Sequence, residues 1–434
     1  MTKKIAENID ETYRVCDPDL PLKADDERYV DLTESRGMKH LAKTITRNIN
    51  RSAEHSQVKM LFTGHRGSGK TTELFRLKKE LEDNQYFTVY MDVEELLDLG
   101  SLNYLDVLVA IAKQVQMTLH EHDMPISEEL LNNIANWFAE TIIEDDTQTS
   151  HEAAIKTGAE AGIEIPFFTK IFASITANIK AASSRRETVR TNLKREISIF
   201  INFLNTLISE ARQTVQNNNL KDIVLIVDGI EKMHYEINKD GHSSHSQLFV
   251  QHAEQLRAPE CHIIYTVPVS LAYNQNLGAD FDSITVLPMV KIDEKGTAQL
   301  IDVIKQRVDI NKVFEDTTLL EQLSQVSGGV VRDLMRLIRI STDTDNEKIS
   351  QDEVDYAINT LKKEYDRLIR NDDIKSLQHI VETKRVQADE TIARLLNLRL
   401  VLEYQNGERW ADLHPIIYRI AWIKDALNNE DKKA

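Results

Sequence analysis

The sequence contains little cysteine, glycine and proline, and its acidic side chains outnumber its basic ones. The 434 residues include only 2 cysteines, Cys16 and Cys261, which excludes a disulfide framework and favours reduced thiols in a cytoplasmic setting. The 14 glycines and 8 prolines are too few for a turn-dense all-β fold and favour helices. The formal net charge of −17 argues against a protein that coats nucleic acid or anionic membrane over its whole surface.

Long apolar runs are also absent. No window of about 18 residues is apolar and free of charge, so we expect no membrane-spanning helix and no membrane partner. The first residues, MTKKIAENIDETYRV, lack the apolar stretch and the small-residue cleavage site of a signal peptide. The hydrophobic share of 41% suffices for folded cores, and the length predicts two or three domains of a cytoplasmic protein.

The apolar segments that are present are short and recur along the chain. The predicted strands are 58–63, 87–93, 223–227, 262–267 and 284–287. Each run is bounded by polar or helical segments, which is typical of a parallel sheet covered by helices on both faces. Positions 105–216 have a helical and charged pattern that is too long for an ordinary crossover, and we interpret them as a helical insertion with one loop near Pro166.

One segment has a spacing that suits phosphate binding. After the first predicted strand the chain reads GHRGSGKT and continues as a helix. Glycines let the backbone approach a phosphate closely, and the amides at a helix start attract anions, so the pattern predicts an ATP-binding loop. We expect Lys70 to contact the β- and γ-phosphates and Thr71 to offer its hydroxyl to Mg²⁺. The predicted nucleotide contacts in the loop are Gly64, His65, Arg66, Gly67, Ser68, Gly69, Lys70, Thr71 and Thr72.

Two acids follow the third predicted strand. In DIVLIVDGIEK, Asp228 comes directly after an apolar run and Glu231 follows shortly after it. A carboxylate at the end of a buried strand can share Mg²⁺ with Thr71, so Asp228 is the second predicted metal residue. Glu231 is the candidate general base or water-positioning residue, with a solvated acid at a helix start as the alternative. Glu73 is interpreted as an acid favoured by the helix dipole.

Four segments, in the order GHRGSGKTTEL, LIVDGIEK, IIYTVP and SGGVVRDLMR, resemble the AAA+ superfamily of P-loop ATPases. They fall nearest the signal-transduction ATPases with numerous domains (STAND) and the origin-recognition-type initiator ATPases. The sequence is also similar to uncharacterised bacterial ATP-binding proteins, some of which sit in antiphage-defence or genetic-conflict loci. The resemblance covers about residues 30–345 without the insertion. It implies an α/β fold with a three-layer P-loop parallel sheet and a helical lid.

The resemblance also implies roles for three residues outside the loop. Thr266, near the end of HIIYTV, matches the first sensor position, where a polar side chain touches the γ-phosphate or the attacking water. Arg332, in GVVR, matches the second sensor, a lid arginine that reaches the γ-phosphate. Arg36, before Gly37, matches the linker that packs near adenine. The alternatives for the two sensors are a strand-end threonine and an arginine on a solvated helix face. The predicted catalytic set is Lys70, Asp228, Glu231, Thr266 and Arg332.

The sequence departs from the AAA+ pattern in two places. Gly229 follows the strand-end aspartate, where the superfamily usually has the catalytic glutamate. No arginine lies between Thr266 and Lys305, so the usual finger that acts on a neighbouring subunit is missing, and Arg257 is the remaining candidate for it. These departures favour a slow nucleotide switch over a ring-shaped motor.

The end of the chain has the pattern of a small separate module. The pair Asn406-Gly407 between two strand-like runs predicts a β-hairpin. Helices and hairpin together resemble the winged helix that both related groups often carry. Positions 372–434 contain 10 Lys+Arg and 11 Asp+Glu, whereas a wing that reads DNA should be basic. The predicted domains are an N-terminal polar arm and linker helix (1–57), an ATPase core (58–292), a helical lid (293–371) and a winged-helix-like domain (372–434).

These features lead to one principal hypothesis and two alternatives. We expect an ATP-binding switch or slow ATPase that controls assembly with itself or with a separately encoded effector, and the resemblance implies bacterial antiphage defence as a setting. One alternative is a DNA-binding initiator or loader that uses Arg385, Arg394 and Arg399 of the tail, although the charge does not favour DNA. The other is a non-hydrolysing nucleotide-bound scaffold. The basic run around Arg186 and Arg190 either contacts a partner or nucleic acid, or balances acids of neighbouring helices.

Overall fold

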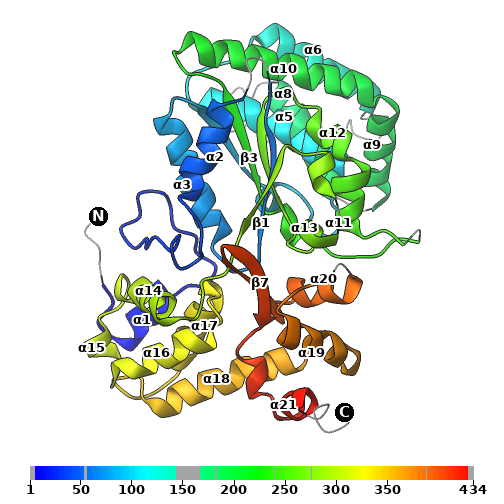
Figure 1. Cartoon of the computed structure of the whole chain (residues 1–434). Coiled ribbons are helices and arrows are strands. Elements are labelled where there is room, and N and C mark those ends of the chain that lie inside the picture. Colours follow the sequence, from blue (N-terminus) through cyan, green and yellow to red (C-terminus); the bar gives the residue numbers. More distant parts are fainter. Residues whose placement is uncertain are drawn as a thin grey trace.

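The computed structural model describes residues 5–52, 56–142, 167–180, 183–239, 241–274, 276–387 and 389–428. The chain forms two lobes, one built around a sheet and one mostly helical (Figure 1). The loop is predicted around Pro166, Phe167 and Phe168. Pro166 lies outside the described residues, whereas Phe167 and Phe168 begin the helix α8 (Phe167–Lys180).

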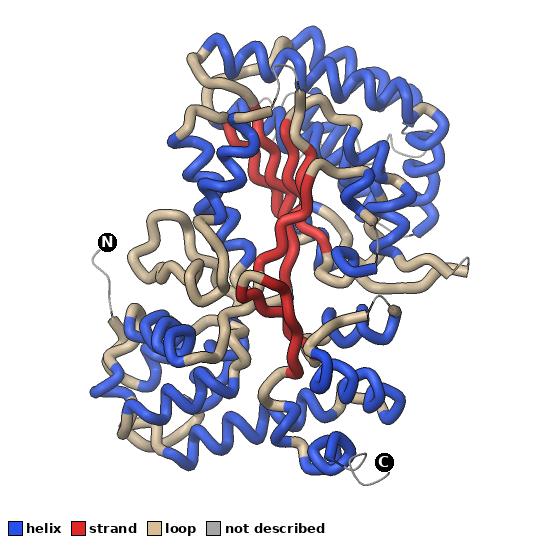
Figure 2. The backbone as a smooth tube through the Cα atoms, in the orientation of Figure 1, coloured by secondary structure: helices blue, strands red, loops and turns tan. Residues whose placement is uncertain are grey.

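The sheet lobe contains five parallel strands in the order β2-β3-β4-β1-β5 (Figure 2). Their bounds are β1 Lys59–Gly64, β2 Phe87–Asp92, β3 Ile223–Asp228, β4 His262–Val267 and β5 Ser283–Leu287. The three central strands are buried along their whole length, as expected for strands covered on both faces. Because β4 pairs with both β1 and β3, the phosphate loop, Thr266 and Asp228 meet at one edge of the sheet.

One face of the sheet is covered by α2 (Leu41–Asn50) and α3 (Lys70–Asp83). Both helices present apolar residues at helical spacing to the strands. The core on this side includes Leu41, Ile45, Ile49, Met60, Phe62, Leu74, Leu77, Leu81 and Ile226. Since α3 begins at Lys70, the phosphate loop ends at a helix N-terminus, which attracts anions.

The opposite face is covered by the helices of the predicted insertion. They are α5 (Tyr104–Glu121), α6 (Glu128–Trp137), α8 (Phe167–Lys180), α9 (Ser183–Arg195) and α10 (Ile197–Asn217). Helix α5 packs on β2 and α10 packs on β3, and all five helices share one hydrophobic core with the sheet. The insertion is therefore part of the sheet lobe, and its first and last helices form the crossover from β2 to β3.

The basic run in α9 has acidic partners within the protein. Nη1 of Arg186 lies 2.6 Å from Oδ2 of Asp98, and Nε of Arg190 donates to Oδ1 of Asp106 at 3.1 Å. These contacts favour the interpretation that the run balances acids of neighbouring segments.

The second lobe begins with the helices predicted as a lid. They are α14 (Glu294–Lys305), α15 (Ile310–Val313), α16 (Thr317–Val326), α17 (Val331–Ser341) and α18 (Gln351–Asp366). The N-terminal polar stretch, predicted as an arm, contains a helix, α1 (Ile9–Val15), that packs on α17. Ala6 and Cys16 on either side of α1 are buried in the core of this lobe. The prediction missed α1 because so short a helix has too few apolar residues for a periodic pattern.

The C-terminal segment adds α19 (Ile374–Thr383), α20 (Glu390–Asn397), β6 (Val401–Asn406), β7 (Glu408–Leu413) and α21 (Ala421–Asn428). The hairpin predicted at Asn406-Gly407 is confirmed, since β6 and β7 pair in antiparallel register around Gly407. Its helices share one hydrophobic core with the lid. The hairpin lies where the two lobes meet (Figure 1), and Met289 N donates to Glu403 O at 2.9 Å.

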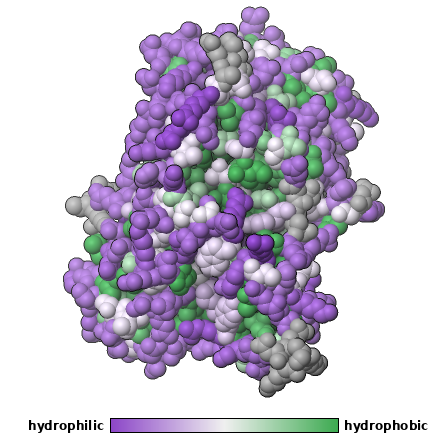
Figure 3. Space-filling view, in the orientation of Figure 1, coloured by the Kyte–Doolittle hydropathy of each residue, from purple (hydrophilic) through white to green (hydrophobic). Residues whose placement is uncertain are grey.

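Short helical segments make up the rest of the described secondary structure. They are α4 (Val93–Leu96), Phe138–Ile142, Ile230–Lys232, α11 (Ser244–Ser246), Gln247–Gln251, α12 (Ala253–Arg257), α13 (Leu271–Asn274), Leu277–Ala279, Asn371–Asp373 and Ile417–Arg419. None of the described helices is long and apolar enough to cross a membrane. The face seen in Figure 3 is predominantly hydrophilic.

Candidate functional site

The phosphate loop joins the end of β1 to the start of α3. Gly67 and Gly69 have φ angles of +83° and +95°, a region that L side chains rarely adopt. A Cβ atom on Gly67 would lie 2.7 Å from Cβ of Arg332 in the lid. Glycine at this position therefore permits both the backbone conformation and the close approach of the lid.

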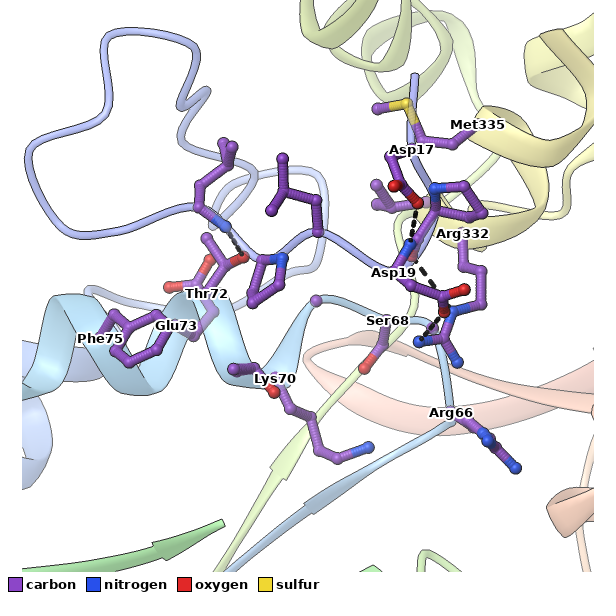
Figure 4. A pocket seen from close by; sticks show the side chains of 18 of the residues that line it. Asp17, Asp19, Arg66, Ser68, Lys70, Thr72, Glu73, Phe75, Arg332 and Met335 are labelled. Atoms are coloured by element: carbon purple, nitrogen blue, oxygen red, sulfur yellow. Dashed lines mark hydrogen bonds and ion pairs between the residues drawn. The ribbon is translucent and has the colours of Figure 1, made fainter. Parts of the chain in front are cut away.

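A cavity of about 530 Å³ adjoins this loop, a volume typical of small-ligand sites. It is bordered by the loop, by Glu231 of the sheet lobe, by Arg332 and Met335 of α17, and by residues 17–22. Figure 4 shows Lys70, Ser68 and Arg332 around this space, with Asp19 extending toward Arg332. The cavity thus lies between the sheet lobe, the lid and the N-terminal segment.

Lys70 is nearly buried at the base of the site. Its Nζ donates to Gly64 O at 3.0 Å and to His65 O at 3.2 Å, and it lies 3.1 Å from Oε1 of Glu231. Burial raises the pKa of Glu231, but the Lys70 ammonium and the nearby Thr266 hydroxyl lower it, and the net shift of this pKa is downward. Glu231 is therefore an anion that is paired with Lys70.

Thr71 and Asp228 lie next to each other. Oγ1 of Thr71 donates to Oδ2 of Asp228 at 2.8 Å, and the Tyr90 hydroxyl donates to the same oxygen at 2.8 Å. Burial and the Glu231 charge raise the pKa of Asp228 to about 6, although both hydroxyls and Lys70 oppose this shift. Tyr90 is absent from the predicted set. The feature of the sequence that could have indicated Tyr90 is a hydroxyl side chain close to the end of β2, the strand that pairs with β3.

The hydroxyl and carboxylate of this pair fit Mg²⁺. Mg²⁺ prefers hard oxygen ligands and usually combines one or two carboxylates with substrate phosphates. No group of three or more His, Cys, Asp or Glu side chains in the described ranges could hold a metal by itself, so phosphate oxygens would complete the coordination. Buried Ser68 Oγ and Glu231 Oε2 have no hydrogen-bond partner within the part of the chain that the structure describes. Such atoms cost free energy until a ligand or water satisfies them.

Gly229 forms the turn that carries Glu231. Its φ angle is +93°, and a Cβ atom there would lie 3.2 Å from Oδ1 of Asp92. Its N–H donates to Oγ1 of Thr266 at 2.9 Å, and Thr266 is completely buried at the end of β4. The Thr266 hydroxyl thus holds the turn in place, and its role as a sensor stays a prediction.

Arg332 lies in the first turn of α17 and contacts the phosphate loop through its backbone. Its N–H donates to Gly67 O at 3.2 Å. Its side chain points to the N-terminal segment, where Nε donates to Pro18 O at 3.3 Å and Nη2 lies 3.1 Å from Oδ1 of Asp19 (Figure 4). Arg332 therefore borders the cavity, as a sensor would, but its charge is paired with a carboxylate.

Arg36 is buried and supports the phosphate loop from behind. Its guanidinium donates to Pro288 O at the end of β5 and to Ser68 O at 2.6 Å. These contacts fix the loop against the sheet, and a contact with adenine stays a prediction.

The remaining loop side chains make contacts that the sequence pattern does not specify. Arg66 is exposed. Thr72 Oγ1 accepts a hydrogen bond from Leu22 N at 3.1 Å. Glu73 accepts one from the Tyr29 hydroxyl at 3.2 Å, so this acid has a specific partner in addition to the helix dipole.

His65 connects the phosphate loop to the C-terminal hairpin. Its Nε2 accepts a hydrogen bond from Glu403 N at 2.9 Å, and its Nδ1 lies 3.2 Å from Leu396 O. Because Nε2 accepts, Nδ1 must carry the hydrogen and the imidazole is neutral. Both partners are more than three hundred positions away in the chain, and no local pattern in the sequence predicts these contacts.

We expect acid to destabilise the protein partly through His65. Burial lowers the pKa of His65 to about 3, and the charge of Lys70 reinforces this. Between pH 3 and about 6.5 the unfolded chain binds a proton that the folded chain does not, so stability falls as the pH falls. Lowering the pH from 6.5 to 5 should reduce the free energy of unfolding by up to about 2 kcal/mol through this residue.

Urea unfolding at both pH values measures this loss of stability. The variant His65→Gln, which keeps a neutral acceptor and donor, should reduce the loss. An equal pH dependence in wild type and variant would contradict this.

The strand order, the parallel pairing and the loop between β1 and α3 make this a three-layer α/β fold of the P-loop ATPase type. No protein-family model and no curated protein matches the chain. Among solved structures, a Walker-type ATPase of Pyrococcus abyssi is similar at 12% identity and a TM-score of 0.40, over 94% of this chain and 99% of that one. Cdc6p of Pyrobaculum aerophilum is similar at 14% identity and a TM-score of 0.40, over 96% and 98%. A variant of RuvB from Thermotoga maritima is similar at 14% identity and a TM-score of 0.36, over 91% and 98%.

Proposed function

We propose that this protein is an ATP-binding switch with slow hydrolysis, whose nucleotide state controls its assembly with itself or with a partner. The observation that carries this proposal is that the phosphate loop touches two other parts of the protein. Gly67 O accepts from Arg332 N of the lid, and His65 accepts from Glu403 N of the hairpin. A phosphate bound to the loop would therefore act on both contacts.

The choice of ATP as ligand rests on the chemistry around the cavity. The phosphate loop provides backbone amides, a helix N-terminus and Lys70 for the phosphates. Oγ1 of Thr71 and Oδ2 of Asp228, which lie 2.8 Å apart, would hold Mg²⁺, whose charge would offset that of the phosphates. The side of the cavity that faces the lid contributes the apolar side chains of Val30, Leu32 and Met335, which suit a nucleobase.

Hydrolysis is assigned to the turn after β3. In the proposed reaction a water oxygen bonds to the γ-phosphorus while the bond from that phosphorus to the β–γ bridging oxygen breaks, and ADP and phosphate are released. Glu231 would accept the water proton or align the water. Lys70 now holds this carboxylate at 3.1 Å, so moving Lys70 toward phosphate would free Glu231 for this role. The lack of arginine between Thr266 and Lys305 supports slow turnover.

The tail supports assembly better than DNA binding. Of the three arginines considered for DNA phosphates, Arg394 is paired with Asp373 and Arg399 lies 3.5 Å from buried Asp333. Only Arg385 is exposed among them. The hairpin follows two helices, as in the winged helix of the STAND group, and we propose the same module here. We propose that the partner is a separately encoded effector protein and that the setting is bacterial antiphage defence.

Light scattering of the full chain tests the switch. We expect the mass in Mg²⁺–ATP to differ from that in Mg²⁺–ADP and without nucleotide, because only a triphosphate reaches both the loop and Arg332. Lys70→Ala should keep the nucleotide-free mass under all three conditions. Identical masses for the wild type in all three conditions, alone and with the effector, would rule out nucleotide-controlled assembly. A salt-dependent shift with duplex DNA would instead favour the initiator alternative.

A further inference from the structure

A segment of the N-terminal arm runs along the cavity beside the phosphate loop. This arm segment, residues 17–22, lines the cavity along its length. It is attached to the sheet lobe where Leu22 N donates to Thr72 Oγ1 at 3.1 Å. It is attached to the lid by Asp17, whose Oδ1 lies 3.5 Å from Nη1 of Arg339. The arm segment therefore bridges the two lobes at the point where nucleotide would enter.

Within the arm segment, Asp19 is directed at Arg332. Its Oδ1 lies 3.1 Å from Nη2, while the adjacent Pro18 carbonyl accepts from Nε at 3.3 Å (Figure 4). The Asp19 side chain is 78% exposed and that of Arg332 is 24% exposed, so Asp19 can turn away into solvent at little cost. The Arg332 side chain is the less exposed of the two, and its backbone N–H donates to Gly67 O of the phosphate loop at 3.2 Å.

We infer that Asp19 determines how this site distinguishes a nucleoside triphosphate from a diphosphate, because its carboxylate takes the place of the terminal phosphate on Arg332. The inference rests on the proposed function and assigns a regulatory contact within it. A carboxylate and a phosphate oxygen bind a guanidinium through the same N–H groups. Two anions on one arginine also repel each other. A terminal phosphate must therefore displace Asp19 before it reaches Arg332.

The consequence differs between the two nucleotides. ADP has no γ-phosphate, so it can occupy the loop while Asp19 and Arg332 stay paired. ATP gains the Arg332 contact only after it breaks this ion pair, and the energy needed is subtracted from its affinity. Asp19 thus lowers the affinity for ATP relative to ADP. Displacement of Asp19 also removes one contact between the arm segment and the lid, and it does so only when a triphosphate is bound.

Calorimetric titration of the full chain with Mg²⁺–ATP and Mg²⁺–ADP tests this. Because the pair is partly exposed, Asp19→Asn should tighten ATP binding by about two- to fivefold and leave ADP binding within error. Asp17→Asn is the matched control, because it removes the same charge from the same segment but faces Arg339. In an Arg332→Gln background, Asp19→Asn should no longer change the affinity for ATP.

The outcomes separate this inference from the proposed function. A ratio of ATP to ADP affinity that rises only with Asp19→Asn, and only while Arg332 is present, supports it. An equal gain with Asp17→Asn, or a gain that persists without Arg332, would overturn it in favour of a general charge effect. ATP binding that depends on Lys70 but ignores Asp19→Asn would also overturn it and leave the proposed function intact. If the wild type bound neither nucleotide, the proposed function itself would be wrong.

Discussion

Lys70→Ala should abolish measurable ATP binding. Lys70 Nζ lies at the base of the phosphate loop, 3.0 Å from Gly64 O and 3.2 Å from His65 O. Hydrogen bonds to charged groups contribute about 1.5–3 kcal/mol each, so losing two phosphate contacts weakens binding at least a hundredfold. The variant also leaves the Glu231 carboxylate, now 3.1 Å from Nζ, as an unpaired anion facing the phosphates.

Calorimetry with Mg²⁺–ATP measures this loss. Lys79→Ala is the matched control, because Lys79 lies on the same helix but is 46% exposed and interacts with Asp25 and Asp83. It should bind ATP as the wild type does. An affinity for ATP that is equal in Lys70→Ala and the wild type would remove the basis for a nucleotide site at this loop.

Glu231→Gln should keep ATP binding and lose most hydrolysis. The amide preserves the size of the side chain and can still accept a hydrogen bond from Lys70, but it cannot take a proton from water. General-base catalysis typically contributes about 10²- to 10⁴-fold, and phosphate release in steady state should fall by such a factor. The substitution also removes the anion that raises the pKa of Asp228, so Mg²⁺-dependent binding should not weaken.

Glu236→Gln provides the comparison for Glu231→Gln. Glu236 is five positions further along and 71% exposed, so its neutralisation should leave phosphate release unchanged. If Glu231→Gln hydrolysed ATP at the wild-type rate, the base would have to lie elsewhere. If the wild type released no more phosphate than Lys70→Ala, the non-hydrolysing scaffold would be the better description.

Much of the sheet lobe is predictable from local sequence. The runs before the phosphate loop, before Asp228 and through Thr266 are short and largely apolar, and each forms a strand that is buried along its whole length, as expected for a sheet covered on both faces. The spacing of glycines before Lys70 is likewise a local requirement of phosphate binding. Since parallel strands end at the same edge, these motifs also predict that Lys70, Asp228 and Glu231 lie together.

Contacts between distant segments could not be predicted in this way. Tyr90 is an ordinary strand residue until β2 pairs with β3 and brings its hydroxyl to Asp228. The helical insertion was predicted within the ATPase core, but its periodicity does not reveal that α5 and α10 pack on the sheet. Periodicity indicates which face of a helix is apolar, but not which surface covers it.

By itself the sequence determined the phosphate loop, the acidic turn after β3 and the strands that carry them, because each of these depends only on residues that are close together in the sequence. Only the tertiary structure decided what surrounds the loop. His65 meets the hairpin 338 positions away, and Arg332 meets Pro18 314 positions away. The sequence shows that an arginine or histidine has a charge and hydrogen-bonding groups, but it does not show which residues those groups will contact. Its partner is selected when burial of the apolar cores brings particular surfaces together.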